Sequence, residues 1–330
     1  MEEEKSVYFL APGKRAPGKR DEDDYDSCHK ANHLYKINPS MNNNHSIIDL
    51  SSVCVLPSYI PNDNSFVSLD NKLYVIGGST YVKKDASSYS YRNYTILHKD
   101  VFCMDMRSGF NGVWKRCSPM ILGRRNPLTI AVNGLIYVFG SLDFLYSNQQ
   151  VKPWAEVFDP LADTWSQLPQ PLEKYQLYCN NSCIDYCNGK IFIGMDSKKV
   201  LSFDINDKTW KDWSVPFRYG FNSFAVVDQV MYFSCADGLY AYDLVNTSIF
   251  TGAVDGLKML YKKRGFGDDY EPRGYVLNLG NGKLFLIEDG ITCVKFGVRK
   301  NYDQHGRIFI RADVEASAMY CSYITGLVLM

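Results

Sequence analysis

The sequence predicts an all-β protein in which a four-stranded unit recurs six times and the units close into a ring. Short apolar runs separated by turn residues occur throughout the 330 residues, and none is long and periodic enough for a helix. The same order of strands and turns recurs six times along the chain. The two chain ends supply complementary parts of one sheet, so their pairing would close the ring.

The clearest repeat spans 127–168. Two short apolar runs there flank Asn133-Gly134, which is the strongest two-residue signal for a β-hairpin. After a loop, a third run ends in Asp159-Pro160, and a fourth begins at Thr164-Trp165. A single four-stranded sheet cannot bury both of its faces, so we expect this unit to pack between similar units.

The first unit lacks one strand. An apolar run at 7–10 corresponds to the second strand of the clearest repeat, and the third and fourth strands follow at 34–39 and 46–55. At the other end of the chain, 320–329 form a spare apolar strand with nothing after it. We expect this tail to pair with 7–10, because that pairing completes the blade and removes two exposed sheet edges.

The remaining units repeat the strand order with loops of different length. Their inner hairpins turn at Asp70-Asn71, Asn188-Gly189, Asp228-Gln229 and Asn281-Gly282. The predicted single domain, 1–330, is therefore divided into blades at 6–55 with 319–329, 65–117, 127–168, 180–213, 221–251 and 274–311. Differences in unit length fall in loops, which lie outside the packed sheets.

Composition and charge narrow the classes of partner. The hydrophobic fraction of 46% is enough for a large core, and Lys plus Arg equal Asp plus Glu at 36 each. This balance gives no global attraction to nucleic acid or to an anionic membrane, so we expect neither as a partner. The acidic N-terminus does not resemble a secretory signal, and the ten cysteines are scattered, several of them inside predicted strands. We therefore expect reduced cysteines and a cytoplasmic or nuclear protein.

These residues resemble the kelch repeat, in which a turn precedes an apolar run ending in two glycines, followed by a strand ending in Asp-Pro and then by Thr-Trp. The matching segments are 73–78, 133–140, 157–160 with 164–165, and 203–204 with 209–210. The first, fifth and sixth units are degenerate, but the resemblance covers nearly the whole chain. It implies a six-bladed propeller of the kelch and galactose oxidase superfamily.

We expect neither a metal nor another cofactor. Cys28-His29 and His33 have metal-ligand spacing but lack a second convergent pair, and the sequence contains no nucleophile elbow or phosphate-binding glycine loop. The glucosinolate-specifier relatives bind iron through Glu, Asp and His each four residues apart, a triad that this sequence lacks. Galactose oxidase binds copper through two His and two Tyr, and the sparse histidines here argue against such a site. Whether the protein is an enzyme stays open, with the balance against it.

The predicted binding surface lies on one face of the ring. Loops after the second and fourth strands open on the same face, and that face collects the long insertions at 11–33, 79–99, 141–153 and 251–273. A basic position recurs just ahead of the first strand of several blades, and tyrosines surround it. The predicted binding residues are Arg124, Arg125, Arg218, Tyr219, Arg273, Tyr175, Tyr270 and Tyr81. The guanidinium groups would take carboxylates bidentately, and the tyrosines would give rigid aromatic contacts.

An alternative interpretation is that each arginine pairs with an acidic residue of a neighbouring blade, or with backbone carbonyls, and only joins the ring. For Arg125 we weigh the two interpretations equally, whereas for Arg218 and Arg273 binding is slightly favoured. The leading functional hypothesis is a kelch-repeat binding module that presents a protein partner or substrate on one propeller face, as a substrate-recognition component would.

In many similar plant proteins an F-box precedes the propeller and recruits a ubiquitin ligase. Six residues precede the first predicted strand in this sequence, so we expect no F-box ahead of the propeller, and this expectation argues against an adaptor role. The second hypothesis is a small-molecule enzyme, or a catalyst similar to the specifier proteins, that uses the channel mouth with Tyr and Arg as acid and electrostatic groups. A small-molecule ligand is the corresponding alternative to a protein partner.

Overall fold

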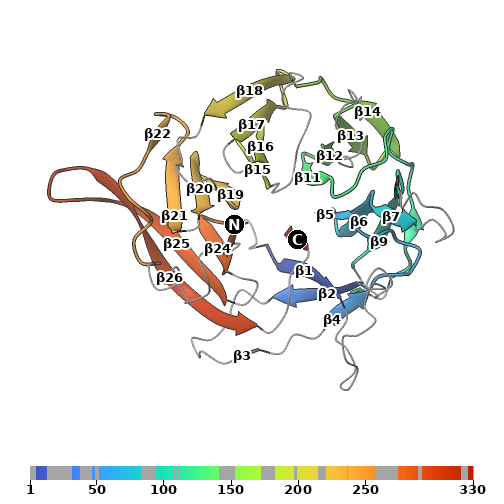
Figure 1. Cartoon of the computed structure of the whole chain (residues 1–330), viewed down its shortest axis with the longest axis horizontal. Coiled ribbons are helices and arrows are strands. Elements are labelled where there is room, and N and C mark those ends of the chain that lie inside the picture. Colours follow the sequence, from blue (N-terminus) through green and yellow to red (C-terminus); the bar gives the residue numbers. More distant parts are fainter. Residues whose placement is uncertain are drawn as a thin grey trace, which may run out of the picture.

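In the computed structural model, the sheets stand around a central axis as the blades of a propeller (Figure 1). Five sheets have four strands and one has five, and all the described secondary structure is β. Within the described part of the chain, no helix is long and apolar enough to cross a lipid bilayer. The structure describes residues 5–12, 32–37, 47–48, 52–82, 94–107, 109–110, 112–140, 153–171, 183–196, 199–214, 221–235, 237–257, 274–288, 292–320 and 326–329.

Each blade is an antiparallel sheet. Blade 2 contains β5 (Ser65–Leu69), β6 (Lys72–Ile76), β9 (Val101–Asp105) and β10 (Lys115–Arg116), with β7 (Ser79–Val82) and β8 (Tyr94–Leu97) as a separate hairpin. Blade 3 contains β11 (Leu128–Val132), β12 (Leu135–Phe139), β13 (Ala155–Asp159) and β14 (Thr164–Gln167). Blade 4 contains β15 (Ile184–Cys187), β16 (Lys190–Asp196), β17 (Lys199–Asp204) and β18 (Thr209–Ser214).

The last two blades follow the same order. Blade 5 contains β19 (Ser223–Val227), β20 (Val230–Cys235), β21 (Gly238–Asp243) and β22 (Ser248–Ile249). Blade 6 contains β23 (Gly274–Gly280), β24 (Lys283–Glu288), β25 (Thr292–Tyr302) and β26 (Ile308–Tyr320). A short fifth strand, β3 (Ile47–Ile48), pairs in parallel with the end of β26.

The ring is closed by the two chain ends, as the sequence predicts. Blade 1 has the order β27 (Gly326–Leu329), β1 (Val7–Pro12), β2 (Asn32–Ile37) and β4 (Ser52–Val55). β27 pairs antiparallel with β1, and Val7 lies opposite Leu329. The prediction of an all-β, six-bladed propeller closed by its C-terminal strand is therefore confirmed. Each of the other blades takes its four main strands from one continuous part of the chain, whereas blade 1 pairs the N-terminal β1 with the C-terminal β27.

The inner hairpins turn where the sequence predicts. In all five described hairpins between the first and second strands, both central residues have positive φ, between 47° and 78°. Turns with two such residues match the twist of the flanking strands, which is why Asn-Gly and Asp-Asn pairs occur there. At the other hairpins, Asp159, Asp204 and Asp243 end the third strands, and each carboxylate accepts hydrogen bonds from backbone N–H groups two and three residues later. The recurring Asp thus closes the outer turn.

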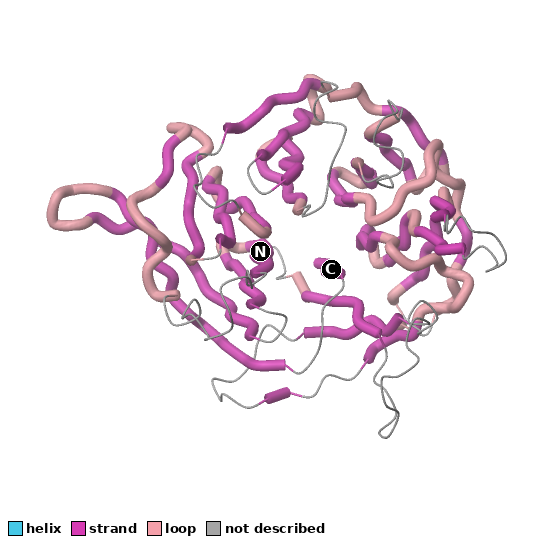
Figure 2. The backbone as a smooth tube through the Cα atoms, viewed as in Figure 1, coloured by secondary structure: helices cyan, strands magenta, loops and turns pink. Residues whose placement is uncertain are grey.

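Blade 6 differs from its predicted extent. β25 and β26 run well past the predicted strands and form a hairpin that protrudes from the ring (Figure 2). Ion pairs across the hairpin, Arg299 with Asp313 and Arg307 with Asp303, accompany this extension. As a consequence, Met319 and Tyr320 belong to β26, where they pair with Ile47 and Ile48. Both segments therefore lie in blade 6, although the sequence predicts them in blade 1.

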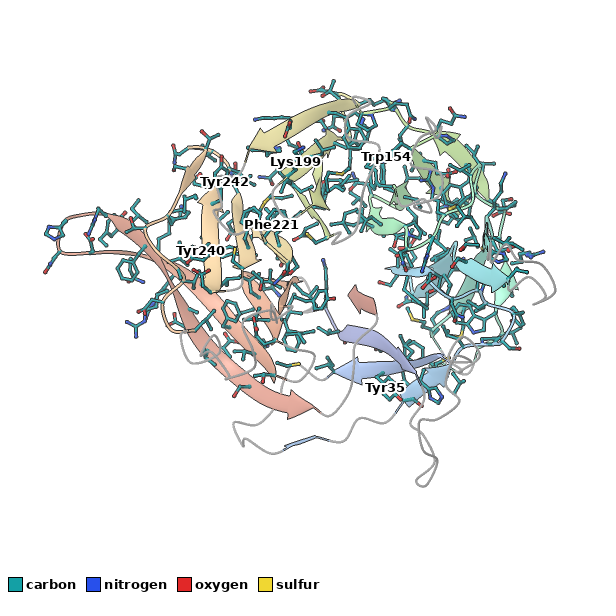
Figure 3. All side chains as sticks on the ribbon, viewed as in Figure 1. Tyr35, Trp154, Lys199, Phe221, Tyr240 and Tyr242 are labelled. Carbon is teal, nitrogen blue, oxygen red and sulfur yellow. The ribbon has the colours of Figure 1, made fainter. Side chains whose placement is uncertain are left out.

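Hydrophobic clusters fill the spaces between neighbouring blades (Figure 3). Trp154, for example, is 1% exposed in the cluster between blades 3 and 4. Tryptophans of the outer strands extend these contacts, because the Trp165 indole N–H donates to the Ser118 carbonyl at 2.8 Å and that of Trp210 donates to the Pro169 carbonyl at 2.9 Å. Each tryptophan therefore ties its own blade to the chain entering from the previous blade.

Candidate functional site

Three loops meet on one face of the ring at blades 2 and 3. We call this region the loop junction and define it as residues 61–64, the two ends of the connection between β6 and β9 at 77–80 and 97–100, and residues 120–126. Backbone hydrogen bonds join the loops: Ser79 donates to Asn62 at 2.7 Å, Gly78 donates to Arg124 at 2.8 Å, and Arg124 donates to His98 at 3.1 Å. These segments follow second or fourth strands, so they lie on the face that the sequence predicts for binding. Their mutual hydrogen bonds hold them as one platform.

A buried ion pair lies beneath the junction. Arg124 and Glu156 have fully buried side chains, and the Arg124 Nε donates to Glu156 Oε1 at 2.9 Å. The other guanidinium nitrogens donate to the carbonyls of Gly140, Trp154 and Pro153 at 2.7–3.0 Å. The second carboxylate oxygen of Glu156 accepts from the Ile121 N–H at 2.8 Å. The guanidinium of Arg124 is thus engaged inside blade 3, by Glu156 and by backbone carbonyls, and its side chain is not exposed.

Arg125 is directly adjacent but reaches the surface. Its Nε lies 2.9 Å from Asp63 Oδ2, and 42% of its side chain is exposed. Asp63 precedes blade 2 and Arg125 precedes blade 3, so the pair joins neighbouring blades. Ser79 orients the same carboxylate by donating to Asp63 Oδ2 at 2.6 Å. Arg125 therefore joins two blades through its ion pair and also has an accessible guanidinium. Its geometry fits both the ring-joining and the binding interpretation.

A second series of polar side-chain contacts runs from β7 to the outer edge of blade 2. Thr80 Oγ1 lies 2.7 Å from His98 Nε2, and His98 Nδ1 lies 3.4 Å from Asp100 Oδ2. Asp100 Oδ1 accepts from Arg116 at 2.5 Å, and the Arg116 side chain is 67% exposed. This chain of contacts fixes the ring of His98 and the direction of the Arg116 guanidinium.

Arg116 belongs to a small aromatic and basic cluster. Its guanidinium lies over the Phe102 ring at 5.7 Å, and the ring of Tyr59 packs on Phe102 with centroids 5.5 Å apart. Tyr59 is 58% exposed. Sequence reasoning did not select Tyr59, His98 or Arg116, because none precedes a first strand directly. Only the pairing of β9 with β10 and the folding back of the preceding loop bring them together.

The other predicted binding residues fall outside the described residues. Arg218, Tyr219, Arg273, Tyr175 and Tyr270 have no described placement, and Tyr81 is described only as a backbone position in β7. The predicted convergence of arginines from blades 3, 5 and 6 thus stays a prediction. Among the residues that are described, no group of three or more His, Cys, Asp or Glu side chains could hold a metal ion.

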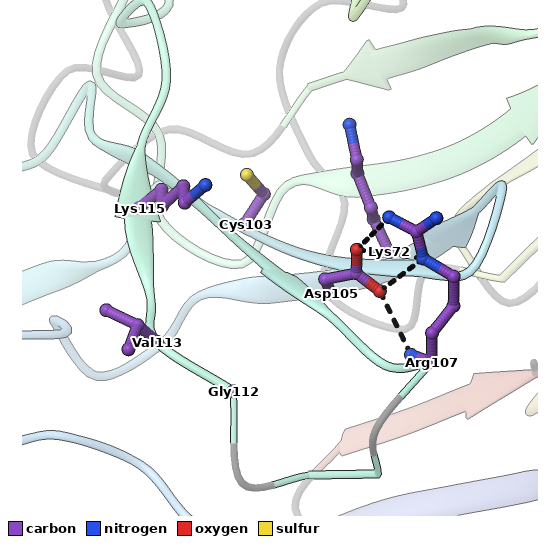
Figure 4. A pocket seen from close by; sticks show the side chains of 7 residues that line it. All are labelled: Lys72, Cys103, Asp105, Arg107, Gly112, Val113 and Lys115. Carbon is purple, nitrogen blue, oxygen red and sulfur yellow. Dashed lines mark hydrogen bonds and ion pairs between the residues drawn. The ribbon is translucent and has the colours of Figure 1, made fainter.

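An open cavity of about 700 Å³ lies at the opposite end of blade 2 (Figure 4). It is lined by Lys72, Cys103, Asp105, Arg107, Gly112, Val113 and Lys115. Asp105 accepts hydrogen bonds from the backbone and the guanidinium of Arg107, and these contacts hold the pKa of that carboxyl well below its usual range. The cavity is separate from the loop junction, because Lys72 begins its strand and Asp105 ends its own.

Comparisons with known proteins agree with the fold. The sequence model of the family described as FKB95, Kelch-repeats domain, matches residues 25–309. One F-box/kelch-repeat protein of Arabidopsis thaliana is 26% identical over 207 residues, covering 61% of this chain and 45% of the relative. Another is 28% identical over 240 residues, covering 70% of this chain and 53% of the relative. The chain thus spans about half the length of these curated relatives.

A solved structure supports the fold alone. The structure of YjhT matches with a TM-score of 0.50 and 12% sequence identity, over 91% of both chains. Identity at this level carries information about chain path and none about ligands. The agreement over nearly the whole chain places all six blades in one propeller.

Proposed function

The chain belongs to the kelch-repeat family, and we propose that its propeller binds a protein partner on the face of the loop junction. The observation that carries this proposal is the arrangement of Tyr59, Arg116 and Arg125, which come from three separate segments and are exposed around a platform of hydrogen-bonded loops. We call these three residues the junction surface. Tyr and Arg are the residue types that dominate binding energy at protein interfaces.

The carboxylates beneath the junction surface support recognition of an acidic partner. Asp63 and Asp100 each engage one side of a guanidinium, so Arg125 and Arg116 are oriented before binding. A guanidinium has five N–H donors, and those left at the surface suit a carboxylate of the partner. Because the loops are already ordered, less conformational entropy is lost on association.

The names of the relatives support a further step in the proposal. They are called F-box/kelch-repeat proteins, which is consistent with a propeller that serves as the substrate-recognition component of a larger assembly. Under this proposal the bound partner is a protein substrate, and it is recognised through acidic groups that meet Arg116 and Arg125. Arg218, Tyr219 and Arg273 precede first strands in the same way and remain predicted extensions of the surface.

Affinity capture with matched variants tests the proposal. Wild-type protein is compared with Tyr59→Ala/Arg116→Ala/Arg125→Ala and with a control pair on the opposite face, Leu161→Ala/Val245→Ala, whose side chains are both exposed. Captured proteins are quantified by mass spectrometry. We expect partners shared by the wild type and the control pair to fall at least about tenfold with the triple variant, since each 1.4 kcal/mol of binding energy is a factor of ten.

Two outcomes would contradict the proposal. One is undiminished capture by the triple variant, and the other is a loss confined to the control pair. Circular dichroism and thermal unfolding show whether each variant keeps the fold. A separate Arg218→Ala/Arg273→Ala variant measures whether the predicted arginines of blades 5 and 6 contribute to the same interaction.

A further inference from the structure

Two cysteines lie together at the outer edge of blade 2, away from the junction surface. Cys103 is in β9, and Lys115 of β10 lies directly opposite it. Cys117 comes two residues after Lys115, so it faces the same side of the sheet and is the diagonal neighbour of Cys103. The register therefore brings two reduced thiols close together on one side of the sheet.

The two thiols differ in access. Cys103 lines the open cavity, and its sulfur lies between the side chains of Lys72 and Lys115 (Figure 4). Both thiols are half-buried and pack against the hydrophobic cluster between blades 2 and 3, but Cys117 is not among the residues that line the cavity. A small reagent that enters the cavity thus meets Cys103 first.

The electrostatic surroundings also distinguish the two thiols, because they lower the pKa of Cys103 and raise that of Cys117. The hydrogen bond from Cys117, with support from the Lys72 and Lys115 ammonium groups, lowers the pKa of Cys103 to about 7 against the opposing effect of burial. The hydrogen bond to Cys103 and burial raise the pKa of Cys117. The thiolate, which is the nucleophilic form, therefore resides on the sulfur that faces the cavity.

We propose that Cys103 and Cys117 form an oxidant-responsive site, in which a small hydroperoxide oxidises Cys103 and Cys117 then closes a disulfide. The Cys103 thiolate attacks the terminal peroxide oxygen, the O–O bond breaks, and the leaving oxygen takes up a proton as water or an alcohol. Cys117 loses its proton and attacks the sulfur of the Cys103 sulfenic acid, and the S–O bond breaks with release of water. Two thiols are oxidised by two electrons and one hydroperoxide is reduced.

The position of the pair allows the bond to close. β10 has only two residues and lies at the outer edge of its sheet, so closing the bond requires a shift of this edge segment, including the hydrogen bond from the Cys117 N–H to Val101, and leaves the inner strands in place. The contrast with other cysteines gives selectivity, because burial raises the pKa of both Cys235 and Cys293 to about 12. The disulfide would anchor the start of the segment that leads to Arg124 and Arg125.

Mass spectrometry of the full chain after treatment with hydrogen peroxide tests the proposal. We expect an intramolecular disulfide that links the Cys103 and Cys117 peptides and is reversed by dithiothreitol. At neutral pH we also expect iodoacetamide to alkylate Cys103 about tenfold faster than Cys187, a half-buried cysteine whose pKa is raised by burial. Cys187→Ser serves as the control variant and should leave both results unchanged.

Two substitutions at one position separate the roles of Cys117. Cys117→Ser keeps a hydrogen-bond donor, so Cys103 should stay as reactive as in the wild type while oxidation stops at a sulfenic acid that dimedone traps. Cys117→Ala removes the donor, so the pH midpoint of Cys103 alkylation should rise. The proposal is overturned if Cys103 remains reduced while other cysteines oxidise, if its disulfide forms with a different cysteine, or if Cys117→Ala leaves the midpoint unchanged.

Discussion

The seam between blades 2 and 3 and the seam between blades 5 and 6 are built differently. Between blades 5 and 6 a hydrophobic cluster that includes Leu286 and Phe296 is accompanied by the buried side chains of Ser234 and Glu288. The Asn278 side chain donates to the Val226 carbonyl there, and the Val276 N–H donates to the Ser223 hydroxyl. Between blades 2 and 3 a hydrophobic cluster is accompanied by a fully buried ion pair. Both seams hold the ring, and in the described part of the chain the ion pair at blades 2 and 3 also lies beneath the loop junction.

The difference indicates what the buried charges do. Removing two charges from water costs several kcal/mol per ion, so a hydrophobic pair of similar size would serve stability as well. The ion pair of Arg124 and Glu156 instead binds four backbone groups of 121–154 in fixed directions. It therefore sets the path of the loop that carries Arg125, which is what a preformed binding surface requires.

The largest expected effect comes from breaking this ion pair. Arg124→Ala leaves Glu156 buried without its charge partner, and we expect a loss of about 3 to 5 kcal/mol in the free energy of unfolding. Urea denaturation monitored by circular dichroism measures it. The double variant Arg124→Met/Glu156→Leu should recover much of this stability while capture by the junction surface stays weak. A loss near zero for Arg124→Ala would show that the seam does not depend on the pair.

The next effect concerns the backbone at the same seam. Gly78 has a φ of 119°, and a Cβ there would lie 2.5 Å from the Asn62 carbonyl oxygen. We expect Gly78→Ala to cost about 2 to 4 kcal/mol, because strain and a backbone clash add. Gly134→Ala is the matched control, since its φ is 76° with nothing within 4 Å, and should cost about 1 kcal/mol. Equal thermal midpoints for the two variants would contradict the close approach of the loops.

A pH effect probes a seam on the other side of the ring. Asp185 of blade 4 accepts from the Val226 N–H of blade 5 at 2.7 Å, and burial raises its pKa to about 6. Because the folded-state pKa exceeds that of the unfolded chain, its contribution to stability is full below about pH 4 and is lost as the pH rises through about 6.

We therefore expect the stability of the wild type, measured relative to Asp185→Asn, to fall by about 2 kcal/mol between about pH 4 and pH 7. Urea unfolding at several pH values for both proteins gives this difference. Parallel pH profiles for the two proteins would show that the carboxyl group is solvated in the folded state.

The smallest expected effect is that of the exposed neighbour of Arg124. Arg125→Ala removes an ion pair with Asp63 that faces water, so the loss of stability should stay below about 1 kcal/mol and shrink as salt is added. The same substitution should nevertheless weaken partner binding. A stability loss as large as that of Arg124→Ala would mean that Arg125 belongs to the seam alone.

Much of the fold could be predicted from local signals. Asn133-Gly134 and the equivalent dipeptides specify turns by backbone chemistry alone, and a missing strand at one chain end with a spare one at the other predicts closure. The extension of blade 6 could not be predicted in the same way, because the additional strand of 297–302 is mostly polar and reads as loop. Its partner strand and ion pairs lie across the hairpin, where only the pairing register shows them.

Less of the candidate site than of the fold could be predicted from the sequence. Arg124 and Arg125 are adjacent and chemically identical, so nothing local tells which one is buried. The available signal was Glu156, which lies two residues from Phe158 and so faces the same side of its strand as that aromatic residue. A charged residue on the core-facing side requires a partner, and Arg124 supplies it from 32 positions earlier in the chain.

Photo-crosslinking shows whether the junction surface is the face that meets the partner. A photoreactive phenylalanine analogue is placed at Tyr59 in one protein and at Leu161, on the opposite face, in another. We expect crosslinks to a common partner protein from position 59 and none from position 161. Crosslinking of that partner from position 161 alone, or equally from both positions, would contradict the account.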